Sequence, residues 1–217
     1  WFMSSFHLSK SVGPSSELAC SFSCSVMSSF DIELFNIGYI GSVDYSKIHK
    51  SFISMSAAIN IPNSKFIICG EGHDRKKIQK ESKRYLKSKF KFVGFVENVK
   101  KILESLDIFG YPLNPTHFGS GEQAIIEAMH AGLPVVAFSN PAEKEIIKNK
   151  ENGILVNSEN EYLESMKFLY NNPSERKRIG DNARKHIISE LSPKKCFKKL
   201  DSIYSKTMKL NKRIRFF

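Results

Sequence analysis

From Phe35 onward, short apolar runs alternate along the chain with longer segments whose apolar residues recur at helical spacing. The runs are bounded by turn residues and predict buried strands at 35–41, 65–70, 90–96, 107–113, 133–138 and 153–156. The segments between them predict helices at 46–59, 99–106 and 121–132 and a basic helix within 73–91, and three more helices follow at 160–171, 174–189 and 194–210. Strand–helix alternation predicts an α/β fold, a Rossmann-like doubly wound parallel sheet with helices on both faces.

The same spacing predicts which side chains face the core. Gly132 ends the predicted helix at 121–132, and Pro173 and Pro193 mark the starts of the last two helices. His130 lies in an apolar helix and is expected in the interior. The other expected inward-facing residues are Ile48, Phe52, Met55, Ile59, Ile78, Tyr85, Leu86, Ile102, Leu103, Leu106, Ile125, Ala128 and Met129.

The bulk composition is that of a globular protein of about one domain. The chain has 217 residues, 41% hydrophobic and 25% charged, and no apolar run approaches the length of a membrane span. Cys20 and Cys24 are too few for a zinc site, and Cys69 is expected in the core. The scattered cysteines are expected to be reduced thiols, which favours a cytoplasmic protein. Residues 1–34 are rich in serine and form no independent domain, so the expected division is 1–34, a Rossmann-like domain at 35–192 and a basic helical tail at 193–217.

The net charge is +11, and most of it falls in residues 73–91 and 194–215. A solvated helix face is the favoured interpretation of the first region, ahead of a binding surface for nucleic acid, anionic lipid or a phosphorylated substrate. No nucleic-acid-binding motif accompanies the charge, so nucleic acid is not expected as a partner. The basic tail is suited to an anionic membrane surface, which predicts peripheral attachment to the membrane.

The loops that follow the strands carry the candidate chemistry, because ligands of such sheets bind beyond the carboxyl ends of the strands. Gly41 ends the first strand, Asp44 is a candidate helix cap, and Lys47 is expected in the first helical turn. A cation there suits a bound diphosphate, although a surface lysine explains it equally well. Gly70 and Gly72 allow a tight strand-to-helix turn, for which packing alone is a sufficient reason.

The loop at 117–123 is the most informative segment. Gly119 and Gly121 permit close approach of the backbone to a ligand, and Ser120 and Gln123 have capping-box spacing. The start of the helix offers free N–H groups to an anion. Glu122 and Glu127 are suited to bind the hydroxyls of a ligand. The alternative is that Glu122 is only stabilised by the dipole at the helix start and that Glu127 is a solvated surface residue. Phosphate together with hydroxyls indicates a nucleotide sugar.

From about Ser29 to Glu190, the chain resembles the C-terminal, donor-binding half of retaining GT-B glycosyltransferases of the "glycosyl transferases group 1" family. The resemblance rests on EAMHAGLPVVA, its most specific part, and on NGILV, YIGSVDYSK, FIICGEG, FVGFVEN and SLDIFGYP in the right order. It implies one half of a GT-B fold, a nucleotide-diphosphate-sugar donor, a glycan or lipid-linked acceptor, and no metal or other cofactor. Residues 1–34 would then be the remnant of an acceptor domain and linker, and the last helix would cross back to that domain.

The resemblance also assigns roles to residues. Lys47 matches the lysine that holds the diphosphate, and Glu127 matches the glutamate that binds the ribose. The loop from Gly119 to Glu122 matches the one over the sugar and phosphates, and Val93, Gly94 and Phe95 match the loop beside the base. Gly41, Ser42, Gly70 and Gly72 complete the expected donor site, and Glu145 matches a recurrent acidic position.

Two departures from the family pattern bear on catalysis. Ser42 stands where the family usually has arginine, and Gly119 stands where it has the first of two glutamates. In this reading Glu122 takes over the sugar contact, and Lys47 and Glu122 are the expected catalytic residues. The sequence therefore predicts a retaining glycosyltransferase whose truncated chain is expected to be inactive alone. A non-catalytic nucleotide-binding module, or a degenerate glycosyltransferase domain, is the alternative.

Overall fold

The computed structural model describes residues 34–85, 89–117 and 122–211, and within these the centre of the fold is one parallel sheet. Its strand order is β3-β2-β1-β4-β5-β6. The strands are β1 (Phe35–Ile40), β2 (Ser64–Cys69), β3 (Phe90–Gly94), β4 (Ile108–Tyr111), β5 (Val135–Phe138) and β6 (Ile154–Val156). The order reverses beside β1, which is the arrangement of a doubly wound Rossmann-like sheet, and it confirms the predicted fold class.

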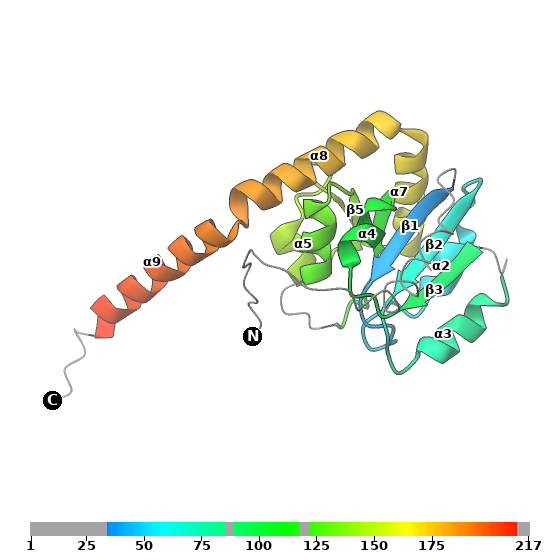
Figure 1. Cartoon of the computed structure of the whole chain (residues 1–217), viewed down its shortest axis with the longest axis horizontal. Coiled ribbons are helices and arrows are strands. Elements are labelled where there is room, and N and C mark those ends of the chain that lie inside the picture. The colour runs from blue at the N-terminus through cyan, green and yellow to red at the C-terminus, as the bar shows by residue number, and fades with distance from the viewer. Residues whose placement is uncertain (1–33, 86–88, 118–121, 212–217) are drawn as a thin grey trace, which may run out of the picture. The chain divides into compact units, whose positions relative to one another are not determined.

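Helices cover both faces of this sheet (Figure 1). In the described part of the chain they are α2 (Phe52–Ala58), α3 (Arg75–Ser82), α4 (Val99–Glu104), α5 (Gln123–His130), α6 (Pro141–Ile146), α7 (Glu159–Asn171), α8 (Pro173–Glu190) and α9 (Pro193–Asn211). The sequence did not predict α6, although Pro141 at its first turn is a start signal that the sequence carries. No helix in the ranges described is both long and apolar enough to cross a membrane.

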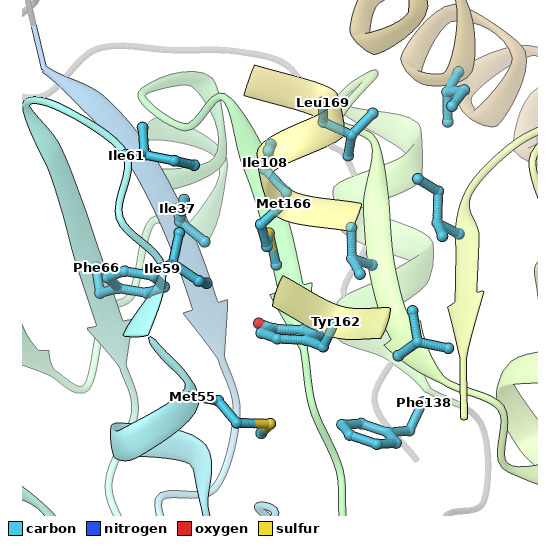
Figure 2. Packing of buried hydrophobic residues seen from close by; sticks show 14 residues of the cluster. Ile37, Met55, Ile59, Ile61, Phe66, Ile108, Phe138, Tyr162, Met166 and Leu169 are labelled. Atoms are coloured by element: carbon cyan, nitrogen blue, oxygen red, sulfur yellow. The ribbon is translucent and has the colours of Figure 1, made fainter. Parts of the chain in front are cut away.

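The core between the sheet, α2 and α7 follows the predicted periodicity. Figure 2 shows Tyr162, Met166 and Leu169 of α7 facing the sheet, with Met55 of α2 on the same side. On the opposite face, the side chain of Leu106, which follows α4, packs directly against the backbone of β1. A Cβ at Gly38 would lie only 2.1 Å from it. Of the inward-facing residues predicted, Tyr85 is wrong, with 40% exposure, because α3 ends at Ser82. Leu86 lies outside the described residues, and the others except His130 are buried.

The helix predicted at 46–59 begins only at Phe52. The preceding residues form a turn, because Ile48 makes an isolated antiparallel bridge with Leu113 and the N–H of His49 donates to the carbonyl oxygen of Pro112. Lys47 is therefore not in the first turn of a helix, and that prediction is wrong. Residues 1–33, including Cys20 and Cys24, lie outside the described residues. The predicted domain boundaries stay predictions.

Candidate functional site

Four polar side chains meet where β4 ends and α5 begins, and we name them the Glu122 cluster: Lys47, Tyr111, His117 and Glu122. The Tyr111 hydroxyl donates to Oε2 of Glu122 over 2.5 Å. Lys47 Nζ lies 3.8 Å from the same oxygen, and His117 Nε2 lies 3.9 Å from Oε1. The Glu122 side chain is only 3% exposed, so the carboxylate faces these three groups rather than bulk water.

Backbone hydrogen bonds of the loops hold Lys47 in the cluster. The N–H of Lys47 donates to the carbonyl oxygen of Asp44, and the N–H of Asn114 donates to the carbonyl oxygen of Lys47. The Asp44 carboxylate accepts from the N–H of Ser46 over 2.8 Å, and this hydrogen bond is the main cause of its lowered pKa. Asp44 thus stabilises a turn and does not cap a helix. The turn brings Lys47 to the carboxyl edge of the sheet.

Two stacked tyrosines form the floor of the Glu122 cluster. The rings of Tyr39 and Tyr111 are 5.7 Å apart, and Lys47 Nζ lies 5.8 Å from the centre of the Tyr111 ring. Burial raises the pKa of both hydroxyls well above the ordinary tyrosine range. Both therefore remain neutral hydrogen-bond donors at any physiological pH, and Tyr39 donates to the carbonyl oxygen of Ser42.

A second buried carboxyl, Glu143, lies close enough to the cluster to interact electrostatically with Glu122 and Lys47. It is 1% exposed and accepts a hydrogen bond from Nδ2 of Asn140 over 3.4 Å. Desolvation raises its pKa, the charge of Glu122 adds to the rise, and Lys47 opposes it. Glu143 was not predicted from the sequence, although it lies in the first turn of α6, directly after β5 at the carboxyl edge of the sheet. Glu145, which the resemblance singled out, is exposed.

Several of the other predicted residues line a cavity of about 370 Å³ beside the ends of β1 and β2. Gly41, Ser42, Gly70 and Phe95 contribute to its wall, with Glu71, Val96 and Val99. Phe95 is 75% exposed at the surface of the molecule. Gly94 has a φ of +84°, which favours glycine. Val93 lies in β3 next to this loop.

Gly70 and Gly72 have a packing role. A Cβ at Gly70 would lie 1.9 Å from the carbonyl oxygen of Gly41, and one at Gly72 would lie 2.3 Å from that of Val43. Neither distance leaves room for a side chain, so the loops after β1 and β2 pack directly on each other. Packing therefore explains both glycines without a ligand.

Gln123 and Glu127 line a separate groove of about 1070 Å³, bounded by α4, α5, α8 and the start of α9. Gln123 Nε2 donates to Oε1 of Glu127 over 3.2 Å. His130 is exposed in the same groove, so its predicted interior position is wrong. Val99 borders both the groove and the cavity, whereas Lys47 lines neither.

The structure therefore divides the predicted site residues into three groups. Lys47 lies beside Glu122, whereas Gly41, Ser42, Gly70 and Phe95 line the cavity, and Gln123 and Glu127 lie in the groove. Val99 connects the last two. The predicted residues Gly119, Ser120 and Gly121 lie outside the described residues.

Comparison with protein families gives one match over most of the chain: the family model "Glycosyl transferases group 1" matches residues 30–186. The chain is 27% identical over 149 residues to 2-deoxystreptamine N-acetyl-D-glucosaminyltransferase of Niallia circulans, covering 65% of this chain and 38% of that protein. It is 29% identical over 159 residues to alpha-monoglucosyldiacylglycerol synthase of Acholeplasma laidlawii, covering 70% and 39% respectively. The chain thus spans less than half the length of these curated relatives.

Solved structures resemble the fold. Anabaena Alr3699/HepE in complex with UDP superimposes with a TM-score of 0.74 at 18% identity, over 88% of this chain and 54% of that one. The C-terminal domain of the glycosyl transferase group 1 family protein LpcC from Francisella tularensis superimposes with a TM-score of 0.65 at 23% identity, over 73% and 87%. At these identities the likeness shows the fold alone.

Proposed function

This chain belongs to the glycosyl transferases group 1 family, and on that premise we propose that it binds a nucleotide-diphosphate sugar. We propose further that the protein transfers the sugar, with retention of configuration, to a glycan or lipid-linked acceptor. The observation that carries the proposal is the position of Lys47 and Glu122, 3.8 Å apart at the carboxyl edge of the sheet. Ligands of doubly wound sheets bind at this edge.

Each part of the donor has a candidate place. Lys47 provides positive charge for the diphosphate, and stabilisation of the charge that develops on a leaving group is usually the largest single contribution to catalysis. Glu127 in the groove is suited to accept hydrogen bonds from two ribose hydroxyls. Its neighbour across the groove, Val99, also borders the cavity where Phe95 offers a ring to a flat base. HepE was crystallised with UDP, which supports a nucleotide ligand for a domain of this shape.

A thermal-shift panel tests donor binding directly. The chain is heated with UDP, GDP and ADP and with UDP-glucose, GDP-mannose and ADP-glucose, each at a saturating concentration. A ligand that binds only the folded state raises Tm, so at least one of the six is expected to do so. No shift with any of them, confirmed by calorimetry, would contradict the proposal.

A non-catalytic nucleotide-binding module remains the second candidate, and the burial of Glu122 favours it. A carboxylate that is 3% exposed and contacted by Tyr111 is not free to hold a sugar hydroxyl. Hydrolysis of a radiolabelled donor separates the candidates when it is measured on a protein that includes the expected acceptor domain, because an active transferase releases sugar to water slowly even without its acceptor. Nucleotide binding without any release of labelled sugar would favour the binding module.

The last helix supports a further part of the proposal, attachment to an anionic membrane surface. Five residues of α9 are apolar and 44% to 64% exposed: Phe197, Leu200, Ile203, Tyr204 and Met208. Their three- and four-residue spacing puts most of them on one face. The helix is rich in lysine, and Asp201 is its only acidic residue. A basic amphipathic helix of this kind binds in the interface of anionic bilayers.

A further inference from the structure

The charges of the Glu122 cluster almost cancel, which is a problem for any anionic ligand. Lys47 is positive and Glu122 is negative, 3.8 Å apart, so the pair presents no net charge. Glu143 contributes further negative charge whenever it is ionised. Tyr39 and Tyr111 are neutral. A diphosphate that approached Lys47 would therefore need a second group that can donate hydrogen bonds or carry positive charge.

His117 has the position and the unused capacity for that task. Its Nε2 is buried and has no hydrogen-bond partner among the described residues. The distance of 3.9 Å to Glu122 Oε1 is too long for a hydrogen bond. Because this nitrogen faces a carboxylate, it is better suited to carry a proton than a lone pair, which the carboxylate would repel. A buried N–H without a partner is unfavourable, and a ligand oxygen would satisfy it.

Lys47 also lies beside the Glu122 carboxylate without hydrogen-bonding to it, but near Oε2 rather than Oε1. Its Nζ also stays beyond hydrogen-bonding distance of Glu122, and its side chain is 25% exposed. The two donors thus flank Glu122 without closing on it. Tyr111, in contrast, makes a full hydrogen bond to Oε2 and fixes the carboxylate between them.

We propose that His117 donates a hydrogen bond from Nε2, together with Lys47, to the distal phosphate of the bound donor, and that Glu122 is a positioning residue that orients both. This inference rests on the proposed function, because it requires a nucleoside diphosphate at the sheet edge. It reassigns Glu122 from contact with the sugar to orientation of the two donors. It also adds a ligand-binding role for His117.

Comparing diphosphates with monophosphates tests the role of His117. Affinities for UDP, GDP and ADP, and for UMP, GMP and AMP, are measured by calorimetry with wild type, His117→Ala and His117→Gln. For the base that binds, His117→Ala is expected to weaken diphosphate binding at least about tenfold, equivalent to about 1.4 kcal/mol. Monophosphate binding should change by less than about threefold, because the distal phosphate is absent. His117→Gln, which retains an N–H donor, should recover most of the loss.

The outcomes separate the two proposals. If wild type binds none of the diphosphates, the proposed function fails. If it binds them and His117→Ala weakens monophosphate and diphosphate equally, or neither, the role of His117 is overturned while the proposed function stands. His186→Ala is the matched control, because this histidine lies on α8 outside the cluster, the cavity and the groove. It should change neither affinity.

Discussion

Tyr111 at the end of β4 donates its hydroxyl to Oε2 of Glu122, the residue that precedes α5. The bond joins the sheet to the helix across the loop between them, and it leaves Glu122 with one acceptor oxygen directed at His117. A buried carboxylate is costly unless hydrogen bonds and opposite charges satisfy it. The Tyr111 hydroxyl is therefore expected to stabilise the buried carboxylate of Glu122.

Replacing Tyr111 with phenylalanine should destabilise the protein by about 1 to 3 kcal/mol, because a hydrogen bond to a buried charged group is lost. Urea denaturation measures the change. Tyr162→Phe is the matched control, since the hydroxyl of this fully buried tyrosine has no hydrogen-bond partner in the part of the chain that the structure describes. Its removal should be neutral or stabilising. Equal losses in the two variants would show that the Tyr111 bond contributes nothing specific.

Lys47→Ala and Glu127→Ala should each weaken nucleotide binding, for different reasons. The first removes the cation expected at the diphosphate, and the second removes the expected ribose acceptor, so each should lower affinity by about tenfold or more. Calorimetry with the nucleotide identified by thermal shift provides the measurement. The control is Lys50→Ala, a nearby lysine that is exposed. Unchanged affinity in both site variants would refute the assigned donor site.

Gly180 should not tolerate alanine, although alanine normally stabilises a helix interior relative to glycine by about 0.5 to 1 kcal/mol. A Cβ there would lie 2.1 Å from the carbonyl oxygen of Gly132, where α8 packs against the end of α5. The helices would have to separate, and a loss of about 1 to 3 kcal/mol is expected. Lys185→Ala, at an exposed position of the same helix, should change stability little. Stabilisation by Gly180→Ala would contradict the close packing.

Glu143 should make stability depend on pH. Its pKa is raised in the folded state, so the folded protein binds the proton more tightly than the unfolded chain does. The stabilisation is complete below the ordinary glutamate pKa and is lost as pH rises through the raised value. Glu143→Gln should remove this fall in stability, so the variant gains on wild type toward neutral pH. Urea denaturation at several pH values from about 4 to 8 tests this, and parallel curves for the two proteins would rule it out.

The exposed apolar residues of α9, which we call the α9 apolar face, should bind an anionic membrane. They are Phe197, Leu200, Ile203, Tyr204 and Met208. Vesicles with anionic lipid should float the wild-type chain, whereas neutral vesicles should not, because attraction to the lysines contributes to binding. A double change of Leu200 and Tyr204 to serine should abolish flotation. Phe168→Ser is the control, since this residue is also apolar and exposed but lies on α7. If the double variant still floats, the α9 apolar face does not bind the membrane. If the wild-type chain does not float, a protein surface is favoured as the partner of this face.

The sequence by itself determined the order and type of nearly all strands and helices of the described fold. Local periodicity is enough for this, because alternation and helical spacing report which side of an element is buried, as with Ile125, Ala128 and Met129 of α5. It also pointed to the loops at the carboxyl edge of the sheet. The helix α6 escaped because its Pro141 start signal is not followed by a long periodic run.

Only the tertiary structure decided how the loops meet. The turn that holds Lys47 depends on the bridge between Ile48 and Leu113, residues far apart in sequence, and no local pattern announces it. The same meeting of loops buries Glu122 and Glu143, and it leaves Nε2 of His117 buried without a hydrogen-bond partner among the described residues. Periodicity records burial along one element, whereas contacts between loops arise from the parallel packing of several strands. The strand pattern therefore predicted that the candidate residues lie at the carboxyl edge of the sheet. Only the packing of the loops determined how the charged side chains at this edge are arranged.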